Sequence, residues 1–393
     1  MNQAFQRRDP HAVRCRGRVR FFMPPEWNEA DVHRLRKAII RILCVLSVLA
    51  AGLIAVATGA QASVPNRWGF AHVNLTSGIP DPAHQAGSWA PGFNVSVAPG
   101  GVGQTYVTFP QLAIDGGVVH VTAIAQTAYW CQAQKWGPVG ADLVAVVQCY
   151  KYGGGPVFTP YSIVFEQSTG ILPAPQAFGY VHHNGSSIVT QFNSAGPANS
   201  VLPVVAGVWN VTLPGLGSSG LAGNVQVTAV NSNQPARCKV GGWSSALGAQ
   251  TVQVRCHNAT NVPLATGWTL TYQRERAITG AAVPPKNFAY TFDNTPANPG
   301  PYAPVPPQVN YNSQGGTNTV QTAGLGQRLV TFPKVGVLQD HVQVTAYGTG
   351  PEFCNLVTLW NTSGNVAIVR NVVCYNGGTR VDQPSLSTYT SAF

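Results

Sequence analysis

Two strand-like phrases recur together three times along the chain. The first phrase reads Val-Thr, then Phe or Leu, then Pro, and lies at residues 107–110, 211–214 and 330–333. The second reads Val-x-Val-Thr-Ala and lies at residues 119–123, 225–229 and 342–346. Each copy then contains one pair of cysteines: Cys131/Cys149, Cys238/Cys256 and Cys354/Cys374. The chain therefore contains an internal repeat in three copies.

The length of the repeat selects among architectures. The second cysteines of successive pairs lie 107 and 118 residues apart in a chain of 393 residues. Propeller blades and solenoid turns take only roughly 20–50 residues, whereas one β-sandwich takes about 100. Prolines precede each copy, as expected of stiff, extended linkers. We expect an all-β protein with three tandem antiparallel β-sandwich domains of the Ig-like kind, at residues 63–173, 174–283 and 284–393.

Apolar and polar residues alternate in the repeated strands with a period of two, which is typical of half-buried antiparallel strands. In residues 119–123, the Val and Ala side chains point to one face, and His120 points to the other. Gln226 and Gln343 take the position of His120 in the other copies. We expect these three side chains, and His72 in an earlier strand, to face solvent.

The regular spacing of the six cysteines after the leader predicts three disulfide bonds, one within each copy. Paired cysteines at repeated spacing are typical of exported proteins. Strand-like segments joined by a polar connection flank the pairs, so a hairpin would bring the two sulfurs together. Closing each loop stabilises a domain by roughly 3 kcal/mol. The pairs are Cys131–Cys149, Cys238–Cys256 and Cys354–Cys374.

Neither a metal site nor a cofactor is expected. No cysteine pair has the Cys-x-x-Cys spacing of a zinc site. The neighbours His182 and His183 form the one local histidine cluster, and adjacent residues on a strand point to opposite faces. His84 lies in a variable stretch of the first copy, where we expect a solvated loop side chain.

The N-terminal segment predicts export. Residues 1–41 form a basic leader, residues 42–57 are apolar and uncharged, and Ala60-Gln61-Ala62 offers a small-residue cleavage site. This is the pattern of a secretory signal, in a bacterial style. The apolar run also approaches the length of a membrane-spanning anchor. Cleavage after Ala62 and an uncleaved anchor both place the repeats in the secreted fraction or on the extracellular face of the cell membrane.

The charge distribution argues against nucleic-acid binding. Charged residues make up 9% of the chain, and the net charge is +10. Residues 1–62 carry +6 of this, and the remainder is spread thinly over 331 residues. Phosphate binding needs clustered Lys and Arg. We expect no nucleic-acid partner, and contact with a membrane only through the N-terminal segment.

No catalytic residues can be assigned. Nine carboxylates are scattered over residues 63–393, and the spacing pairs none of them. The segment 215–220 matches G-x-G-x-x-G, but that motif needs a following helix to present its amides to phosphate. A strand is expected next, so we interpret the match as a flexible turn.

Trp136, Trp243 and Trp360 all lie between paired cysteines and are the candidate binding residues. An exposed indole at this position would stack on a sugar ring or anchor a partner. The alternative is that each indole folds back over its disulfide as part of the core. The regular spacing of the three tryptophans is compatible with both.

We expect a non-catalytic exported repeat protein that presents a binding surface to a cell-envelope polysaccharide or protein. Tandem copies favour this function because linked modules gain avidity without new contacts. A structural component of the cell surface is one alternative. An extracellular hydrolase is the other, and it requires a polar cluster present in only one repeat.

Overall fold

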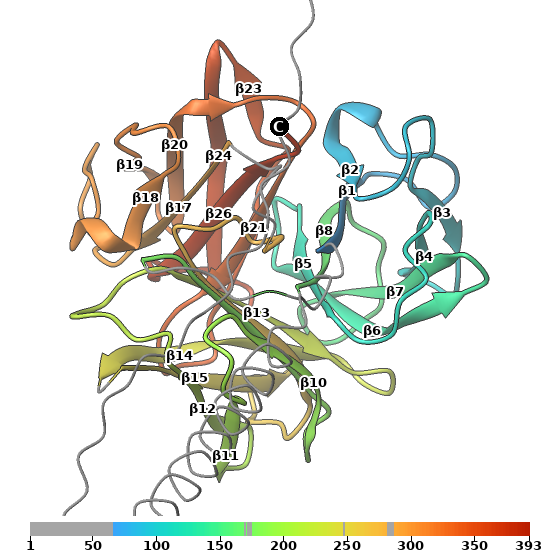
Figure 1. Ribbon diagram of the computed structural model, residues 1–393, viewed down its shortest axis with the longest axis horizontal. Helices are drawn as coiled ribbons and strands as arrows, with labels where there is room; N and C mark the ends of the chain where they lie inside the picture. The colour runs from blue at the N-terminus through green and yellow to red at the C-terminus, as the bar shows by residue number, and fades with distance from the viewer. Residues whose placement is uncertain (1–65, 169, 171–174, 247, 281–286) are drawn as a thin grey trace, which may run out of the picture. The chain divides into compact units, whose positions relative to one another are not determined.

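The computed structural model describes residues 66–168, 170, 175–246, 248–280 and 287–393. These residues form β-strands and two short 3-10 turns, so the all-β prediction is confirmed (Figure 1). In the described part of the chain, no helix is long and apolar enough to cross a membrane. The basic leader, the apolar run and the Ala60/Ala62 cleavage site lie outside the described residues.

The first repeat, β1 to β8, forms two antiparallel layers. One layer has the order β2-β1-β8-β5, with bounds Gln85–Gly87, Arg67–Val73, Tyr161–Gln167 and Val118–Ala123; the turn η1 (Pro82–His84) precedes β2. The other layer has the order β3-β4-β7-β6, with bounds Ser96–Pro99, Gln104–Phe109, Asp142–Lys151 and Tyr129–Val139.

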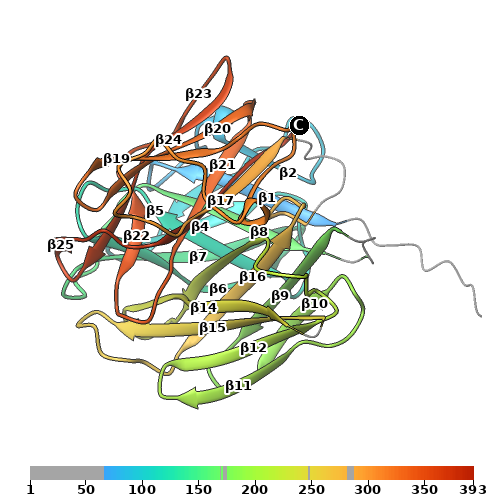
Figure 2. The ribbon, with the colours of Figure 1, turned by 90° about the vertical axis from the view of Figure 1, so that its left-hand side faces the viewer.

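The second repeat, β9 to β16, has the same two layers. One is β10-β9-β16-β13, with bounds Ile188–Asn193, Ala177–His183, Gly267–Arg274 and Asn224–Val230. The other is β11-β12-β15-β14, with bounds Ser200–Val205, Val208–Pro214, Ala249–Asn258 and Ala236–Ala246. Figure 2 shows this layer with β11 at its outer edge. A parallel bridge between Ala133 and Val230 joins β6 of the first repeat to β13.

The third repeat, β17 to β26, follows the same plan. One layer is β18-β17-β26-β21, with bounds Asn310–Asn312, Phe288–Asp293, Ser385–Ser391 and Asp340–Ala346; η2 (Pro307–Val309) precedes β18. The other is β19-β20-β24-β22, with bounds Thr319–Gly324, Gln327–Gly336, Asn365–Asn376 and Phe353–Leu356. Two short strands also pair with β24: β23 (Asn361–Ser363) and β25 (Thr379–Arg380).

The strand order does not confirm the Ig-like assignment. In each repeat the first strand pairs with the last, as β1 does with β8, β9 with β16 and β17 with β26. Ig constant domains instead have the sheets ABED and CFG, in which the first and last strands lie in different sheets. The repeats share one topology, and its strand order differs from that of an Ig constant domain.

Each repeat has its own hydrophobic core between its two layers. In the first, Phe165 of β8 packs with Phe109 of β4 and Val147 of β7. The second core includes Trp268 and Trp209, and the third is built around Phe332. Apolar side chains at alternate positions supply these contacts, as the period of two predicts. The second core also includes Phe292, Val309 and Leu386 of the third repeat, and Ser63–Phe393 form one compact unit.

The expectation that the polar face of the repeated strand meets solvent is wrong. Both faces of β5, β13 and β21 are buried. His120 is 1% exposed, Gln226 2% and Gln343 1%, and His72 is also buried. One face of each strand contacts its own core, while the other contacts a neighbouring repeat, towards the middle of the view in Figure 1. Polar residues on that second face bond to each other instead of to water.

A cyclic set of hydrogen bonds joins the three repeats. One threonine hydroxyl from each repeat accepts a backbone N–H from the repeated strand of another repeat. The bonds are Val121 N–H to Thr228 at 3.2 Å, Val227 N–H to Thr345 at 3.1 Å and Val344 N–H to Thr122 at 2.9 Å. The three repeats are therefore related by a pseudo-threefold arrangement about this network.

Candidate functional site

The three hairpin tryptophans are packed within the protein. Trp243 is 7% exposed and Trp360 is 3% exposed, and both belong to hydrophobic cores. Trp136 is half-buried: its ring lies against His182 with centroids 4.4 Å apart, and its indole donates to the Gly116 carbonyl. Of the two interpretations of the hairpin tryptophans, the structure therefore favours the one in which each indole packs as part of the core.

The three predicted disulfides are present with the predicted pairing. Each joins directly opposite residues of neighbouring antiparallel strands, on β6/β7, β14/β15 and β22/β24. Disulfides of this kind persist in oxidising compartments outside the cytoplasm. They therefore support an extracytoplasmic location.

A pocket of about 220 Å³ lies between the second and third repeats. The second repeat contributes the end of β16 and the connection from β12 to β13, and the third contributes β17, β18 and η2. Its surface is mainly apolar. The side chains with recognition chemistry are Ser218, Arg274, Glu275, Tyr290, Gln308 and Tyr311.

Arg274 fixes the second-repeat wall of this pocket. Its guanidinium donates to the carbonyls of Pro175 at 2.7 Å, Leu216 at 3.2 Å and Gly217 at 3.0 Å. Gly217 must be a glycine, because a Cβ there would lie 2.4 Å from the backbone of Gly248. This glycine belongs to the G-x-G-x-x-G segment, which leads into β13 as expected, so close packing of the backbone explains it.

Two aromatic rings, Tyr290 and Tyr311, line the third-repeat side of the pocket. Tyr311 stacks on Phe288 and on Tyr290, with centroids 5.7 and 5.5 Å apart. Tyr290 is fully buried and its hydroxyl accepts the Glu275 N–H. Burial raises the pKa of both tyrosines, so both phenols are neutral at physiological pH. Half-buried Tyr311 therefore presents a neutral ring and hydroxyl, with the Glu275 carboxylate also lining the pocket.

A second polar cluster joins the first and third repeats around Asp340. This buried carboxylate accepts hydrogen bonds from Trp360 at 2.8 Å, Thr362 at 2.5 Å and Tyr389 at 2.9 Å. His84 Nδ1 lies 2.6 Å from it. The expectation that His84 is solvated is wrong, because the η1 turn directs its ring to this carboxylate from another repeat. With four polar contacts, Asp340 acts as a structural anchor.

His72 lies beside this cluster without joining it. Its ring centroid is 6.0 Å from that of His84 and 5.9 Å from that of Trp360, and its Nδ1 is buried without a hydrogen-bond partner. Burial, together with the neighbouring His84, lowers the pKa of His72 to about 4. The ring is therefore neutral at physiological pH.

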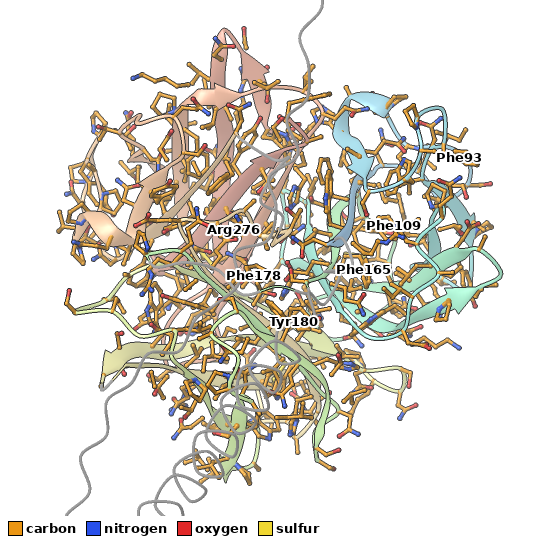
Figure 3. All side chains as sticks on the ribbon, viewed as in Figure 1. Phe93, Phe109, Phe165, Phe178, Tyr180 and Arg276 are labelled. Atoms are coloured by element: carbon orange, nitrogen blue, oxygen red, sulfur yellow. A yellow bond between two sulfur atoms is a disulfide. The ribbon has the colours of Figure 1, made fainter. Side chains whose placement is uncertain are left out.

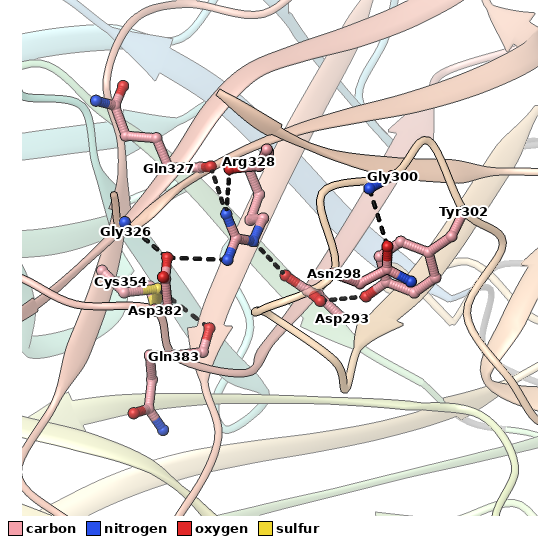
Figure 4. Close-up of polar contacts among 12 residues, drawn as sticks. Asp293, Asn298, Gly300, Tyr302, Gly326, Gln327, Arg328, Cys354, Asp382 and Gln383 are labelled. Atoms are coloured by element: carbon pink, nitrogen blue, oxygen red, sulfur yellow. Dashed lines mark hydrogen bonds and ion pairs between the residues drawn. A yellow bond between two sulfur atoms is a disulfide. The ribbon is translucent and has the colours of Figure 1, made fainter. Parts of the chain in front are cut away.

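A third cluster ties the two layers of the third repeat together (Figure 4). Buried Arg328 donates to Asp382 at 2.9 Å, and its Nε lies at an ion-pair distance of 3.4 Å from Asp293. Tyr302 donates to the other oxygen of Asp293. Burial raises the pKa of Asp293. These contacts occupy the charged groups, so this cluster too is structural.

His182 and His183 point to opposite sides of β9, as expected. His182 lies against Trp136 of the first repeat, whereas His183 stacks on Trp268 in the second core with centroids 5.0 Å apart. Over the described ranges, no group of three His, Cys, Asp or Glu side chains could hold a metal ion.

The pocket and the Asp340 cluster were missed by sequence reasoning because their members come from different repeats. The sequence does contain one signal for the Asp340 cluster. The residue two positions before the repeated Val-x-Val-Thr-Ala phrase is Gly117 in the first copy and Gly223 in the second, but Asp340 in the third. A carboxylate in place of a glycine indicates a contact that the other repeats lack.

Together these features define an all-β, disulfide-bonded protein built of repeats whose junctions are polar and buried. No protein-family model, no curated protein and no solved structure matches the chain.

Proposed function

We propose that this is a non-catalytic exported protein of three β-sandwich domains that binds a saccharide of the cell envelope. The observation that carries the proposal is the pocket between the second and third repeats, with its tyrosine wall. A mainly apolar pocket with a few convergent polar groups is the usual form of a ligand site. Its aromatic faces suit the apolar face of a sugar ring, while the Glu275 carboxylate and the Ser218 hydroxyl suit sugar hydroxyls.

The clusters of charged residues support a binding function over a hydrolytic one. Hydrolysis of a glycosidic bond needs two carboxyl groups about 5–10 Å apart that flank the substrate. The buried carboxylates Asp340 and Asp293 instead have protein partners for both oxygens. Among the described residues, Glu275 is the one carboxylate lining the pocket.

Co-sedimentation with insoluble envelope polysaccharides tests the proposal. The oxidised full-length protein should be retained in a saturable way, and Tyr311→Ala should weaken retention about tenfold, because aromatic contacts and the area they bury are worth about 1–2 kcal/mol. Phe192→Ala is the matched control: Phe192 packs on Tyr180 as Tyr311 packs on Tyr290, but at the other junction. Equal losses in the two variants, or no retention of the wild type, would count against the pocket.

One observation favours assembly of the cell surface as a second candidate function. The edge strand β11 exposes Leu202 (65%), Val204 (50%) and Val205 (65%). An exposed apolar edge strand is a template for pairing with another strand. If this strand mediates assembly, Val204→Lys should shift the protein towards the monomer in light scattering, whereas retention on polysaccharide should stay unchanged.

A further inference from the structure

The three repeats have equivalent edge strands, β3, β11 and β19, which can be compared residue by residue. Each pairs with the strand that carries the repeated Val-Thr-Phe/Leu-Pro phrase. In each edge strand, one valine lies directly opposite the first valine of that phrase: Val97 in β3, Val201 in β11 and Val320 in β19. These three valines therefore occupy the same position, and their surroundings should match unless one edge has a different role.

The chain itself covers this edge in the first and third repeats. The N–H and C=O of Val97 exchange hydrogen bonds with Gly78 at 2.8 and 2.9 Å. Those of Val320 exchange hydrogen bonds with Tyr302, also at 2.8 and 2.9 Å. Both covering residues belong to the connection between the first two strands of their repeat, residues 74–84 and 294–309. The two valines are buried as a result.

The second repeat lacks this cover. The corresponding connection, between β9 and β10, consists of residues 184–187 alone. Among the described residues, β12 is the one strand paired with β11, and no isolated bridge reaches Val201 (Figure 2). Val201 is half-buried, unlike its two counterparts. The backbone groups that the other repeats use on this side are therefore available on β11.

The exposed side chains of β11 also differ from those of the two covered strands. Leu202 is 65% exposed, Val204 50% and Val205 65%. Counted from the equivalent valines, their counterparts are small or polar: Ala98, Gly100 and Gly101 in the first repeat, and Gln321, Ala323 and Gly324 in the third. Of the three edges, the one that the chain leaves open thus carries large apolar side chains at these positions. Such a surface is typical of an interaction site.

The proline of β11 does not prevent pairing at this edge. Pro203 has no N–H, and a proline on an edge strand limits pairing with another strand. Pro99 occupies the equivalent position of the first repeat, yet that edge is covered through Val97. An extended segment that bonds to the valine alone is therefore sufficient.

We propose that β11 pairs with β11 of a second copy of this chain, antiparallel and about a twofold axis. Val201 of each copy exchanges its outward N–H and C=O bonds with Val201 of the other, as Val97 does with Gly78. A twofold contact needs a self-complementary surface. An uncharged, apolar strand that offers one donor and one acceptor at its centre meets this need. The inference rests on the second candidate function, assembly through β11, and names its partner.

Hydrogen–deuterium exchange of the oxidised full-length protein, followed at single amides, tests the pairing. Light scattering first gives the dissociation constant of the dimer. The Val201 amide should then exchange about tenfold more slowly once about nine-tenths of the protein is dimeric, because only the monomer exchanges. The Val97 amide is the internal control: its bond to Gly78 lies within one chain, so its exchange should not depend on protein concentration.

A substitution tests the apolar part of the contact. Leu202→Gln gives β11 the residue that the third repeat has at this position, Gln321, so the variant should fold normally. It should raise the dissociation constant of the dimer about a hundredfold, about tenfold from each copy, because a twofold contact loses the leucine twice. Val262→Gln is the matched control. Val262 is 54% exposed but lies between β15 and β16, so this variant should keep the wild-type constant.

The outcomes separate this pairing from assembly in general. A protein that stays monomeric at every concentration would overturn both. Self-association without protection of the Val201 amide, or with an unchanged constant in Leu202→Gln, would overturn the pairing alone, and assembly would then use another surface. Protection of Val201 that is independent of concentration would also overturn the pairing, because the edge would then be covered within one chain.

Discussion

The junction between the first and second repeats uses the same hydrogen bonds as the junction between the second and third, but its groups are titratable. In the first junction, His120 Nδ1 lies 3.3 Å from the Thr228 hydroxyl. In the second, Thr345 donates to the Gln226 side chain at 2.7 Å. Histidine and glutamine thus occupy equivalent positions and contact equivalent threonines.

The two junctions also differ in the residues that lie behind these threonines and histidine or glutamine side chains. His120 Nε2 lies 2.7 Å from the Thr271 hydroxyl, which donates to the fully buried Glu166 at 2.5 Å. At the other junction, Gln273, the counterpart of Glu166, donates to Thr388 at 2.8 Å. One junction thus holds an imidazole and a carboxyl group where the other holds two amides.

Burial favours the neutral form of both titratable groups. It lowers the pKa of His120 to about 3 and raises the pKa of Glu166 well above its ordinary value. The first junction therefore tolerates neither acid, which would charge His120, nor base, which would charge Glu166. The amides of Gln226 and Gln273, at the equivalent positions of the second junction, do not titrate. The two junctions have similar geometry but a different dependence on pH.

Both junctions also depend on aromatic packing. Phe178 and Tyr180 of β9 pack against Val118 of the first repeat (Figure 3). Their counterparts are Phe288 and Tyr290, which both stack on Tyr311. Of these two, Tyr290 lines the open pocket together with Tyr311. Equivalent aromatic positions therefore pack across one junction, whereas one of them, Tyr290, lines a pocket at the other.

Glu166→Gln should have the largest effect on this comparison, because it gives the first junction the side chain of the second. Since the pKa of Glu166 is raised on folding, its contribution to stability is complete below the ordinary value near 4.5 and is lost as the pH rises. The variant should gain about 1.4 kcal/mol over wild type for each pH unit above that value, until the folded-state pKa is reached. Urea unfolding at several pH values measures this. A constant difference across the pH range would show that Glu166 is not the group responsible.

Thr228→Val and Thr345→Val should each cost about 2 kcal/mol, because each leaves a buried backbone N–H without its acceptor. Equal losses in denaturant unfolding would show that the two junctions contribute alike. Thr76→Val, an exposed substitution, is the control and should be close to neutral. A loss confined to one variant would break the proposed equivalence.

His120→Gln should have the smallest effect, confined to mild acid. Because the pKa of His120 is lowered on folding, its contribution to stability is complete above the ordinary value of 6.5 and is lost as the pH falls towards 3. At pH 5.5 the variant should therefore retain about 1 kcal/mol more of its neutral-pH stability than wild type. Gln226→His is the converse change and should make the free energy of unfolding fall more steeply as the pH is lowered. If the wild type and both variants lose the same stability in mild acid, the loss belongs to other buried histidines, such as His341.

Local sequence patterns predicted much of the fold. The repeated phrases became β4, β12 and β20 and then β5, β13 and β21, and each cysteine pair closed within its own copy. These features depend on side-chain alternation and on residues close in the chain, which the sequence displays directly. The site was not predicted, because Glu275 and Tyr311 come from different repeats and no spacing reveals that they meet.

The sequence by itself determined the three-copy repeat, the strand positions, the three disulfides and which residues of each strand share a face. The tertiary structure alone decided what the second face of β5, β13 and β21 meets. His120 and Gln226 look like solvated strand residues because alternation tells which residues share a face but not what covers it. Burial by a neighbouring repeat turned them into hydrogen-bonded contacts, and the same packing formed the pocket between the second and third repeats.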